Sequence, residues 1–117
     1  MENVKNNNFN SLLSSGHLAL QAKDYAFAEK TLKQALAIYP VNATASYLYG
    51  VSLKYQNKPK KALKYLAIAI NGGLSNDAAA VYQYGELLLS LGKVEKAKQQ
   101  LKNALLKQEN FFQAVHL

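Results

Sequence analysis

The sequence predicts an all-α solenoid of three stacked helical hairpins. Three observations carry this prediction: a repeat of 34 or 35 residues, a composition that is 50% apolar and 18% charged, and Gly or Pro between apolar segments. The 117 residues suit one domain, and this composition argues against wholesale disorder. The chain has no Cys, which excludes disulfides and thiolate metal sites. No apolar run approaches the roughly 18 residues that span a bilayer, and the polar start lacks a signal peptide's apolar core.

The repeat rests on four marks that recur together. Gly50 lies 34 residues after Gly16, and Gly85 lies 35 residues after Gly50. The extra residue falls within 71–77, a turn where an insertion costs little. The other marks keep the same intervals: Ala28, Ala62 and Ala97; Leu32, Leu66 and Leu101; Ala35, Ala69 and Ala104.

Each unit is expected to form two antiparallel helices. Pro40 ends the second helix, Asn42 suits the N-cap of the third, and Pro59 suits the first turn of the fourth. Gly72-Gly73 and Gly92 fit helix ends, where a positive φ is wanted. The expected helices are 9–22, 25–38, 43–56, 59–71, 77–91 and 94–108.

The glycines inside the helices need a reason, because Gly there costs about 1 kcal/mol relative to Ala. Gly16, Gly50 and Gly85 stand in register in the first helix of each hairpin. We expect them to allow close packing against the small alanines of the paired helix, which are Ala28, Ala62 and Ala97.

The pattern resembles the tetratricopeptide repeat, whose signature is W-x2-L-G-x2-Y, then A-x3-F, then P. The third unit reads Val81-x2-Tyr84-Gly85-x2-Leu88 and then Ala97-x3-Leu101. The small residues hold in all three units, whereas most aromatic slots are aliphatic and the closing Pro survives only at Pro40. The resemblance implies a right-handed solenoid over 9–111, with units 9–42, 43–77 and 78–111, a polar leader 1–8, and a further helix or capping segment from 112 to 117. The chain is then either a segment of a longer repeat protein or complete with a short terminal helix.

The resemblance also implies a peptide-binding groove on the first helix of each hairpin. The middle helix supports this independently, because it carries a second apolar stripe beside the one that its hairpin needs. Its tyrosines suit binding hot spots. One subclass of the tetratricopeptide repeat family binds the carboxylates of an acidic peptide with Lys, Asn and Arg side chains in this groove. The resemblance does not imply such binding here, because the matching positions carry no fixed positive charge: Leu13, His17, Leu48, Ala79 and Gln83. The predicted partner-binding residues are Leu13, His17, Leu20, Tyr47, Leu48, Val51, Tyr55, Tyr82, Gln83 and Glu86.

All 14 basic residues are Lys, and the formal net charge is +7. Ten of them lie in 54–107, beside three acids, and most fall on the second helices of units two and three. A solvated outer face explains them best, and an acidic partner or a membrane surface is the alternative. Nucleic-acid binding is not favoured, because Arg is absent and the tyrosines and lysines are expected on opposite faces.

No catalytic constellation is predicted. His17 and His116 lie at opposite ends of the stack, and no metal-binding, phosphate-binding or dinucleotide motif is present. We therefore expect no enzyme activity, no metal and no cofactor in this segment.

The predicted function is a protein-interaction module that binds a peptide or helix of a partner. Three alternatives stay open: the substrate-recruiting domain of a larger enzyme, a small secretion-type chaperone, and self-association through the C-terminal end. The cytoplasm is the default location, because no export signal is visible.

Overall fold

The computed structural model describes residues 2–116, without the side chains of Glu2, Ala104 and 107–116. Within this part of the chain every regular element is helical. The elements are α1 (Glu2–Gln21), α2 (Tyr25–Ile38), α3 (Ala43–Tyr55), α4 (Pro59–Ala69), the π-helical turn η1 (Ile70–Leu74), α5 (Ala78–Ser90) and α6 (Val94–His116).

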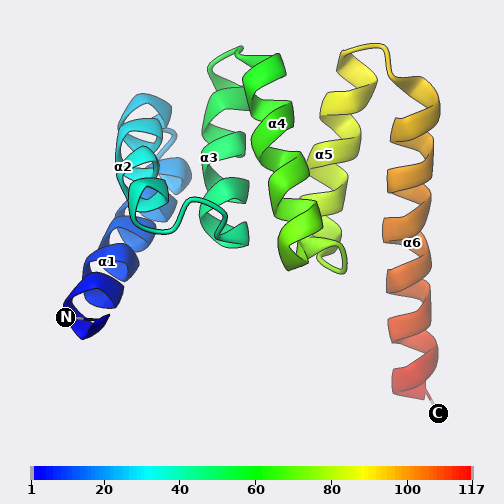
Figure 1. Cartoon of the computed structure of the whole chain (residues 1–117). Coiled ribbons are helices and arrows are strands. Elements are labelled where there is room, and N and C mark those ends of the chain that lie inside the picture. The colour runs from blue at the N-terminus through cyan, green and yellow to red at the C-terminus, as the bar shows by residue number, and fades with distance from the viewer. Residues whose placement is uncertain (1, 117) are drawn as a thin grey trace.

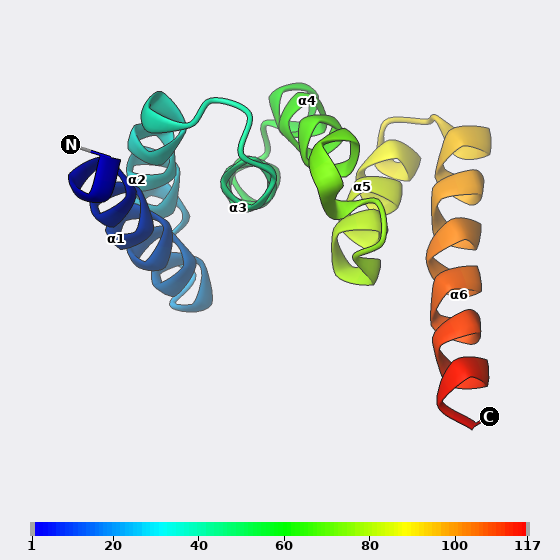
Figure 2. The same ribbon diagram turned by 60° about the horizontal axis from the view of Figure 1, so that its bottom comes forward.

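Three hairpins stand side by side in chain order, α1 with α2, α3 with α4, and α5 with α6 (Figure 1). The same order is seen when the molecule is turned so that α3 is viewed nearly end-on (Figure 2). The radius of gyration is 15.2 Å, above the value of about 13 Å that a compact globule of this length would have. The predicted all-α solenoid is confirmed.

Capping side chains fix where the hairpins begin. The Asn42 side chain accepts a hydrogen bond from the Ala45 amide at 2.9 Å, and Pro59 is the first residue of α4, both as predicted. Asp24 and Asp77 cap α2 and α5 in the same way, which the sequence analysis did not anticipate. Three helices of the stack therefore start at an Asx side chain that satisfies an otherwise unpaired amide.

The turn within each hairpin needs one residue with positive φ. Gly92 has φ 79° in the third hairpin, as predicted, and the equivalent positions hold Lys23 (φ 63°) and Asn57 (φ 62°). Asn tolerates this conformation better than Lys, which has no side-chain group to compensate for it. Gly73 also has a positive φ, of 128°, at the end of η1, whereas Gly72 does not.

The interior glycines make room for leucines as well as for the backbone of the expected alanines, which Gly50 and Gly85 approach at Ala62 and Ala97. A Cβ on Gly50 would lie 2.9 Å from Leu66 Cγ and 3.3 Å from the carbonyl oxygen of Ala62. Leu66 is buried and has no space to retreat. The equivalent pairs are Gly16 with Leu32 and Gly85 with Leu101.

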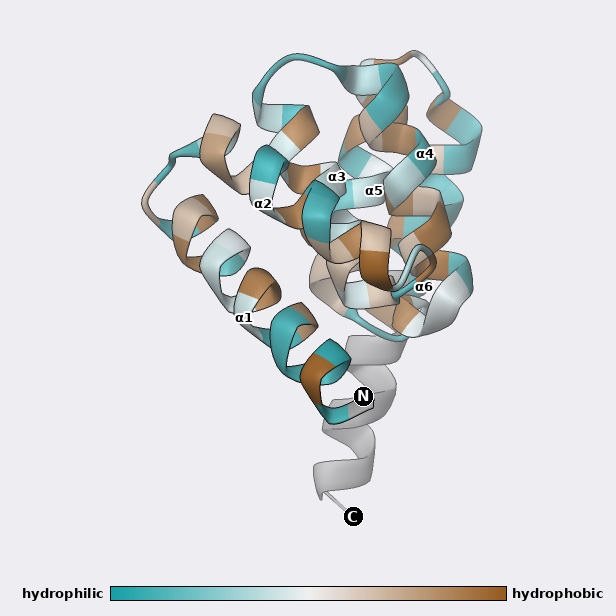
Figure 3. Ribbon diagram, turned by 60° about the vertical axis from the view of Figure 1, so that its left-hand side comes forward, coloured by the Kyte–Doolittle hydropathy of each residue, from teal (hydrophilic) through white to brown (hydrophobic). Residues whose placement is uncertain are grey.

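The first helix is longer than expected and starts at Glu2 instead of near residue 9. Its early turns contact the end of α2: the Phe9 ring meets Tyr39 edge-on at 4.9 Å between centroids, and the Tyr39 hydroxyl donates to Asn6. The ammonium of Lys5 lies 5.0 Å from the centre of the same ring. Residues 2–8 are therefore helical, and Lys5 and Asn6 contact Tyr39, although the composition of this segment is that of a polar leader. Polar and apolar residues alternate along α1 (Figure 3).

The last helix is also longer than expected, because α6 runs to His116 without a break near 108. The sequence has neither Gly nor Pro between Lys93 and Leu117, whereas Pro40 and Gly72-Gly73 end the second helices of the other hairpins. The expected start of a further helix at 112 falls inside α6. The side chains of Phe111, Phe112 and Val115 lie outside the described residues.

Candidate functional site

The face formed by α1, α3 and α5, here called the inner face, contains a hollow between its first two helices. This hollow has a volume of about 460 Å³. Three predicted binding residues meet in it: Leu13 and His17 from α1, and Leu48 from α3. His17 is exposed at the rim, whereas only 6% of the Leu48 surface is accessible, so Leu48 forms the apolar floor. We call this contact the first seam, and its hollow is lined by Leu13, Ser14, His17, Leu18, Gln21, Thr44 and Leu48.

The next contact along the inner face is filled by a polar cluster. The ammonium of Lys54, on α3, donates to Gln83 Oε1 on α5 at 2.6 Å and forms an ion pair with Glu86. The Lys54 side chain is largely buried and Glu86 is about half exposed. This second seam (Lys54, Gln83 and Glu86) joins two predicted binding residues through Lys54, which was expected on the same face but not among the binding residues. The sequence could not have found this pairing, because it joins residues about 30 positions apart on separate hairpins.

The tyrosines of the inner face occupy different environments. Tyr47 is half-buried, and burial, together with the nearby Asp77 carboxylate and the Tyr55 hydroxyl, raises the pKa of its own hydroxyl. It therefore stays protonated at physiological pH and can donate a hydrogen bond. Tyr55 is exposed and stacks on Tyr25 with a centroid separation of 5.0 Å. Tyr82 is 54% exposed on α5.

Two other predicted residues lie mainly in the core. Val51 is buried and Leu20 is partly buried against the hydrophobic cluster. They leave little surface for a ligand and hold α1 and α3 in position instead.

A polar node that the sequence analysis missed ties the first hairpin to the second. The Glu29 carboxylate accepts from Gln56 Nε2 at 2.7 Å and from Lys58 Nζ at 3.0 Å. Burial acts to raise the pKa of Glu29, but these bonds and the nearby lysines outweigh it and lower the pKa below 4.5. Lys33 lies one turn along the same helix, at the i,i+4 spacing that favours an ion pair, but the carboxylate turns to the next hairpin. This pairing also accounts for Lys58 at a helix start, where the dipole disfavours cations.

Two lysines of the second helices lie near tyrosines that are buried in the core. The ammonium of Lys61 lies 5.9 Å from the Tyr49 ring centre, and Lys96 lies 6.0 Å from that of Tyr84, one repeat later. Cation–π attraction holds these ammoniums near the rings of the neighbouring first helices.

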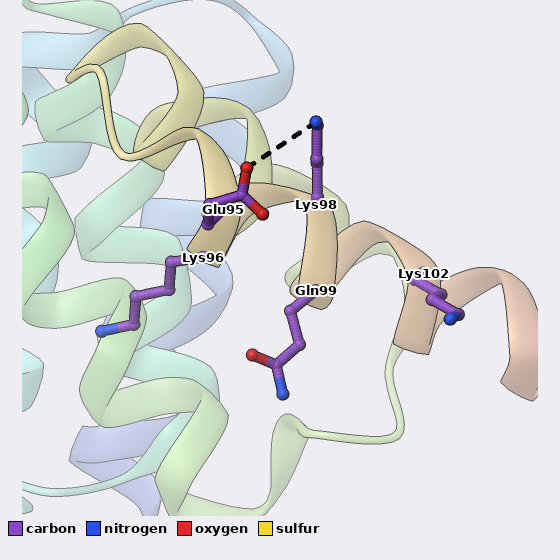
Figure 4. A pocket seen from close by; sticks show the side chains of 5 residues that line it. All are labelled: Glu95, Lys96, Lys98, Gln99 and Lys102. Atoms are coloured by element: carbon purple, nitrogen blue, oxygen red, sulfur yellow. Dashed lines mark ion pairs between the residues drawn. The ribbon is translucent and has the colours of Figure 1, made fainter.

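A second hollow, of about 500 Å³, lies along α6 and is lined by three lysines together with Glu95 and Gln99. Its lysines do not converge on a point: Lys98 turns toward Glu95 at 3.8 Å, whereas Lys96 and Lys102 point in other directions (Figure 4). A compact anion would therefore meet no more than one of these ammoniums at close range.

Among the described residues, no group of three or more His, Asp or Glu is placed to hold a metal ion. The same part of the chain has no helix that is both long and apolar enough to cross a bilayer.

These features define a class, a helical-repeat protein whose stacked hairpins share one inner face. A family model described as "Tetratricopeptide repeat" matches residues 13–54 and 50–111. Because these matches cover most of the chain, the chain belongs to the tetratricopeptide repeat family. No curated protein matches the sequence significantly.

Several solved structures share the fold. A mutant of the O-GlcNAc transferase from Thermobaculum terrenum is 25% identical, with a TM-score of 0.83 over 92% of this chain and 20% of that chain. MamA from Desulfovibrio magneticus RS-1 is 18% identical, with a TM-score of 0.79 over 87% of this chain and 57% of that chain. The second TPR of Spaghetti (RPAP3), bound to the HSP90 peptide SRMEEVD, is 23% identical, with a TM-score of 0.79 over 89% and 97% of the two chains. The chain thus spans little more than half of MamA and a fifth of the transferase.

Proposed function

We propose that the chain is a protein-interaction module that binds a peptide segment or a helix of a partner protein on its inner face. The observation that carries this proposal is the hollow at the first seam. Leu13 and Leu48 offer it apolar walls and His17 offers a polar rim, the combination that small binding sites use. An apolar side chain of the partner would be buried there, and the rim would orient its backbone.

The exposed tyrosines extend this surface along the inner face. Tyr55 and Tyr82 keep about half of their surface accessible, and the first is already held by its stack on Tyr25. A preorganised aromatic ring loses little conformational entropy on binding. Contact with both rings would favour an extended or helical segment over a single small molecule.

The charge of the groove favours an apolar or mixed peptide over an acidic one. Lys54 contacts two of the predicted groove residues, Gln83 and Glu86, and the Glu86 carboxylate already neutralises it. The HSP90 peptide bound by the RPAP3 domain ends in acidic residues, and here its carboxylates would find no free cation of that kind. A small secretion-type chaperone would use the same groove for an apolar client segment.

A second candidate is the substrate-recruiting part of a larger enzyme. The match to the O-GlcNAc transferase favours it, since that protein carries a similar array within a chain about five times as long as the matched part. Under this candidate the groove would still bind a protein segment, and the chemistry would belong to another domain. The cytoplasmic location stays a prediction.

The test is selection of binding peptides from a random displayed library on the whole chain, followed by affinity measurement on two variants. Ser14→Phe places a ring in the hollow, whereas Ser15→Phe places the same ring on the next exposed residue, outside it. We expect apolar peptides whose affinity falls at least about tenfold in Ser14→Phe and stays unchanged in Ser15→Phe. Equal affinity for both variants, with both folded by circular dichroism, would remove the groove from the proposal.

A further inference from the structure

The lysines of α2 and α4 gather on one side of each helix. On α4, Lys60, Lys61 and Lys64 fall within an arc of about 100°, because successive helical residues turn by about 100°. On α2, Lys30 and Lys33 fall within about 60° of each other. All five are exposed, and α2 and α4 both pack on α3 and flank it (Figure 2). We call this surface the lysine face, and its members are Lys30, Lys33, Lys60, Lys61 and Lys64.

The two helices of the lysine face carry more positive charge than the inner helices. In sequence, α1, α3 and α5 carry two lysines and two acids, whereas α2 and α4 carry five lysines and one acid. That acid is Glu29, which turns to the next hairpin and pairs with Lys58. The other ion pairs of the described residues use Lys54 and Lys98, so no member of the lysine face is in an ion pair. Exposed surfaces commonly mix both signs, so a surface of one sign points to an anionic partner.

An aromatic side chain stands on the same side of α2. Phe27 is 51% exposed, and the equivalent positions of the next two hairpins hold the exposed Lys61 and Lys96. It lies one turn before Lys30, and its amide donates to the Asp24 side chain, which fixes the backbone beneath the ring. The sequence alone favours a solvated face. An exposed ring among ammoniums suits instead the boundary of a bilayer, where rings enter the acyl region and lysines stay at the headgroups.

The form of the lysine face selects among anionic partners. Its ammoniums stand on two helices and on flexible stems, so they suit a diffuse layer of negative charge better than one compact anion. Fork-like recognition of a phosphate group requires Arg, and the chain has none. Near an anionic bilayer, each lysine strengthens binding about fivefold without a fixed geometry. An acidic protein segment would account for the lysines but not for the Phe27 ring.

We propose that the lysine face, together with Phe27, binds the surface of a bilayer that contains anionic phospholipids. The ammoniums would lie among the headgroups, and the Phe27 ring would enter the boundary with the acyl chains. This contact is peripheral and needs no membrane-spanning helix. None of its residues lines the hollow at the first seam. The site therefore does not depend on the groove and would leave it free for a peptide.

The test is cosedimentation of the whole chain with vesicles of phosphatidylcholine alone or with about 30% phosphatidylserine. We expect about tenfold or more tighter binding to the anionic vesicles, and about 0.5 M salt is expected to weaken it. The double variant Lys60→Gln/Lys64→Gln is expected to weaken this binding at least about tenfold. The control Lys5→Gln/Lys98→Gln makes the same change in net charge outside the lysine face, and it is expected to keep most of the affinity.

Two single variants test the ring. Phe27→Ser is expected to weaken binding to the anionic vesicles at least about fivefold. Leu18→Ser removes an exposed apolar side chain at the first-seam hollow and is expected to leave this binding unchanged. Equal losses in the two double variants, or no loss in Phe27→Ser, would overturn the proposal in favour of net charge alone. Absence of vesicle binding would also overturn it, in favour of an acidic protein if a poly-glutamate peptide binds and of a solvated face if it does not.

Discussion

The two seams of the inner face are equivalent contacts between neighbouring first helices, and they share one equivalent position, Leu48 and Gln83, but their outcomes are opposite. At the first seam Leu13, His17 and Leu48 leave a hollow of about 460 Å³. At the second seam Lys54 reaches across to Gln83 and Glu86 and fills the space with a charged cluster. The comparison teaches that a repeat fixes where side chains stand, whereas the individual residues decide whether that place binds a ligand or locks two hairpins together.

The largest expected effect on stability comes from overpacking α3, the helix that both seams share. Gly50→Ala on α3 would place a Cβ within 3 Å of the buried Leu66 Cγ. Alanine gains about 1 kcal/mol in a helix, but overpacking against Leu66 costs up to about 3 kcal/mol, so we expect a net loss of about 2 kcal/mol. Urea unfolding measures this loss. The control is Ala26→Gly at an exposed helical position, which loses only the propensity term.

The next prediction concerns the affinity of the inner face for an acidic peptide, which depends on the charge pair at the second seam. Glu86→Gln keeps the shape of the second seam but leaves Lys54 without a counter-charge. We expect the peptide SRMEEVD to bind this variant about tenfold tighter than the wild type, equivalent to about 1.4 kcal/mol. Calorimetric titration measures both affinities. Glu95→Gln is the matched control, because it makes the same charge change at an exposed position on α6, and a gain there would mean that only net charge acts.

The stability of the second seam is the next smaller effect. Lys54→Met removes the ammonium and keeps most of the apolar stem, so the loss comes from the bonds to Gln83 and Glu86. Because Glu86 is half exposed, we expect a destabilisation of about 1 kcal/mol by urea unfolding. Lys60→Met, on the outer surface of α4, is expected to change nothing. Equal destabilisation by the two variants would mean that the bonds of Lys54 do not stabilise the second seam.

The smallest effect is a pH dependence outside both seams. The pKa of Glu29 is lowered in the folded chain, so folding favours its ionised form. Its contribution is complete above its unfolded pKa of about 4.5 and is lost as pH falls through the lower folded value. Thermal unfolding between pH 3 and pH 6 is therefore expected to fall less steeply toward acid in Glu29→Gln than in the wild type. Parallel curves would contradict the assigned bonds to Gln56 and Lys58.

Local features of the fold were predictable and contacts between hairpins were not. The Gly16–Gly50–Gly85 register follows from the repeat period and the Asn42 cap from local capping chemistry, and both appear in the structure. The positive φ of Lys23 could not be predicted from the conformational preference of lysine, because the turn between α1 and α2 imposes it. The position could have been found only by aligning the repeats, which places Lys23 opposite Gly92.

The candidate site also contains one part that was predictable from the sequence and one part that was not. The repeat places Leu13, His17 and Leu48 on one face, and the structure brings them together at one hollow. The Lys54–Glu86 pair joins separate hairpins and depends on side-chain reach, for which the sequence has no signal. The ends of α1 and α6 were misjudged because polar composition at residues 2–8 does not prevent a helix, and no breaker stops α6.

The most direct test of the central claim is an NMR titration of the isotope-labelled whole chain with the strongest library-selected peptide. Binding at the first seam predicts the largest amide shifts at Leu13, His17 and Thr44, with smaller shifts at Gln83 and Glu86. Shifts confined to the outer helices α4 and α6, with Leu13 and Thr44 unmoved, would contradict the inner-face groove.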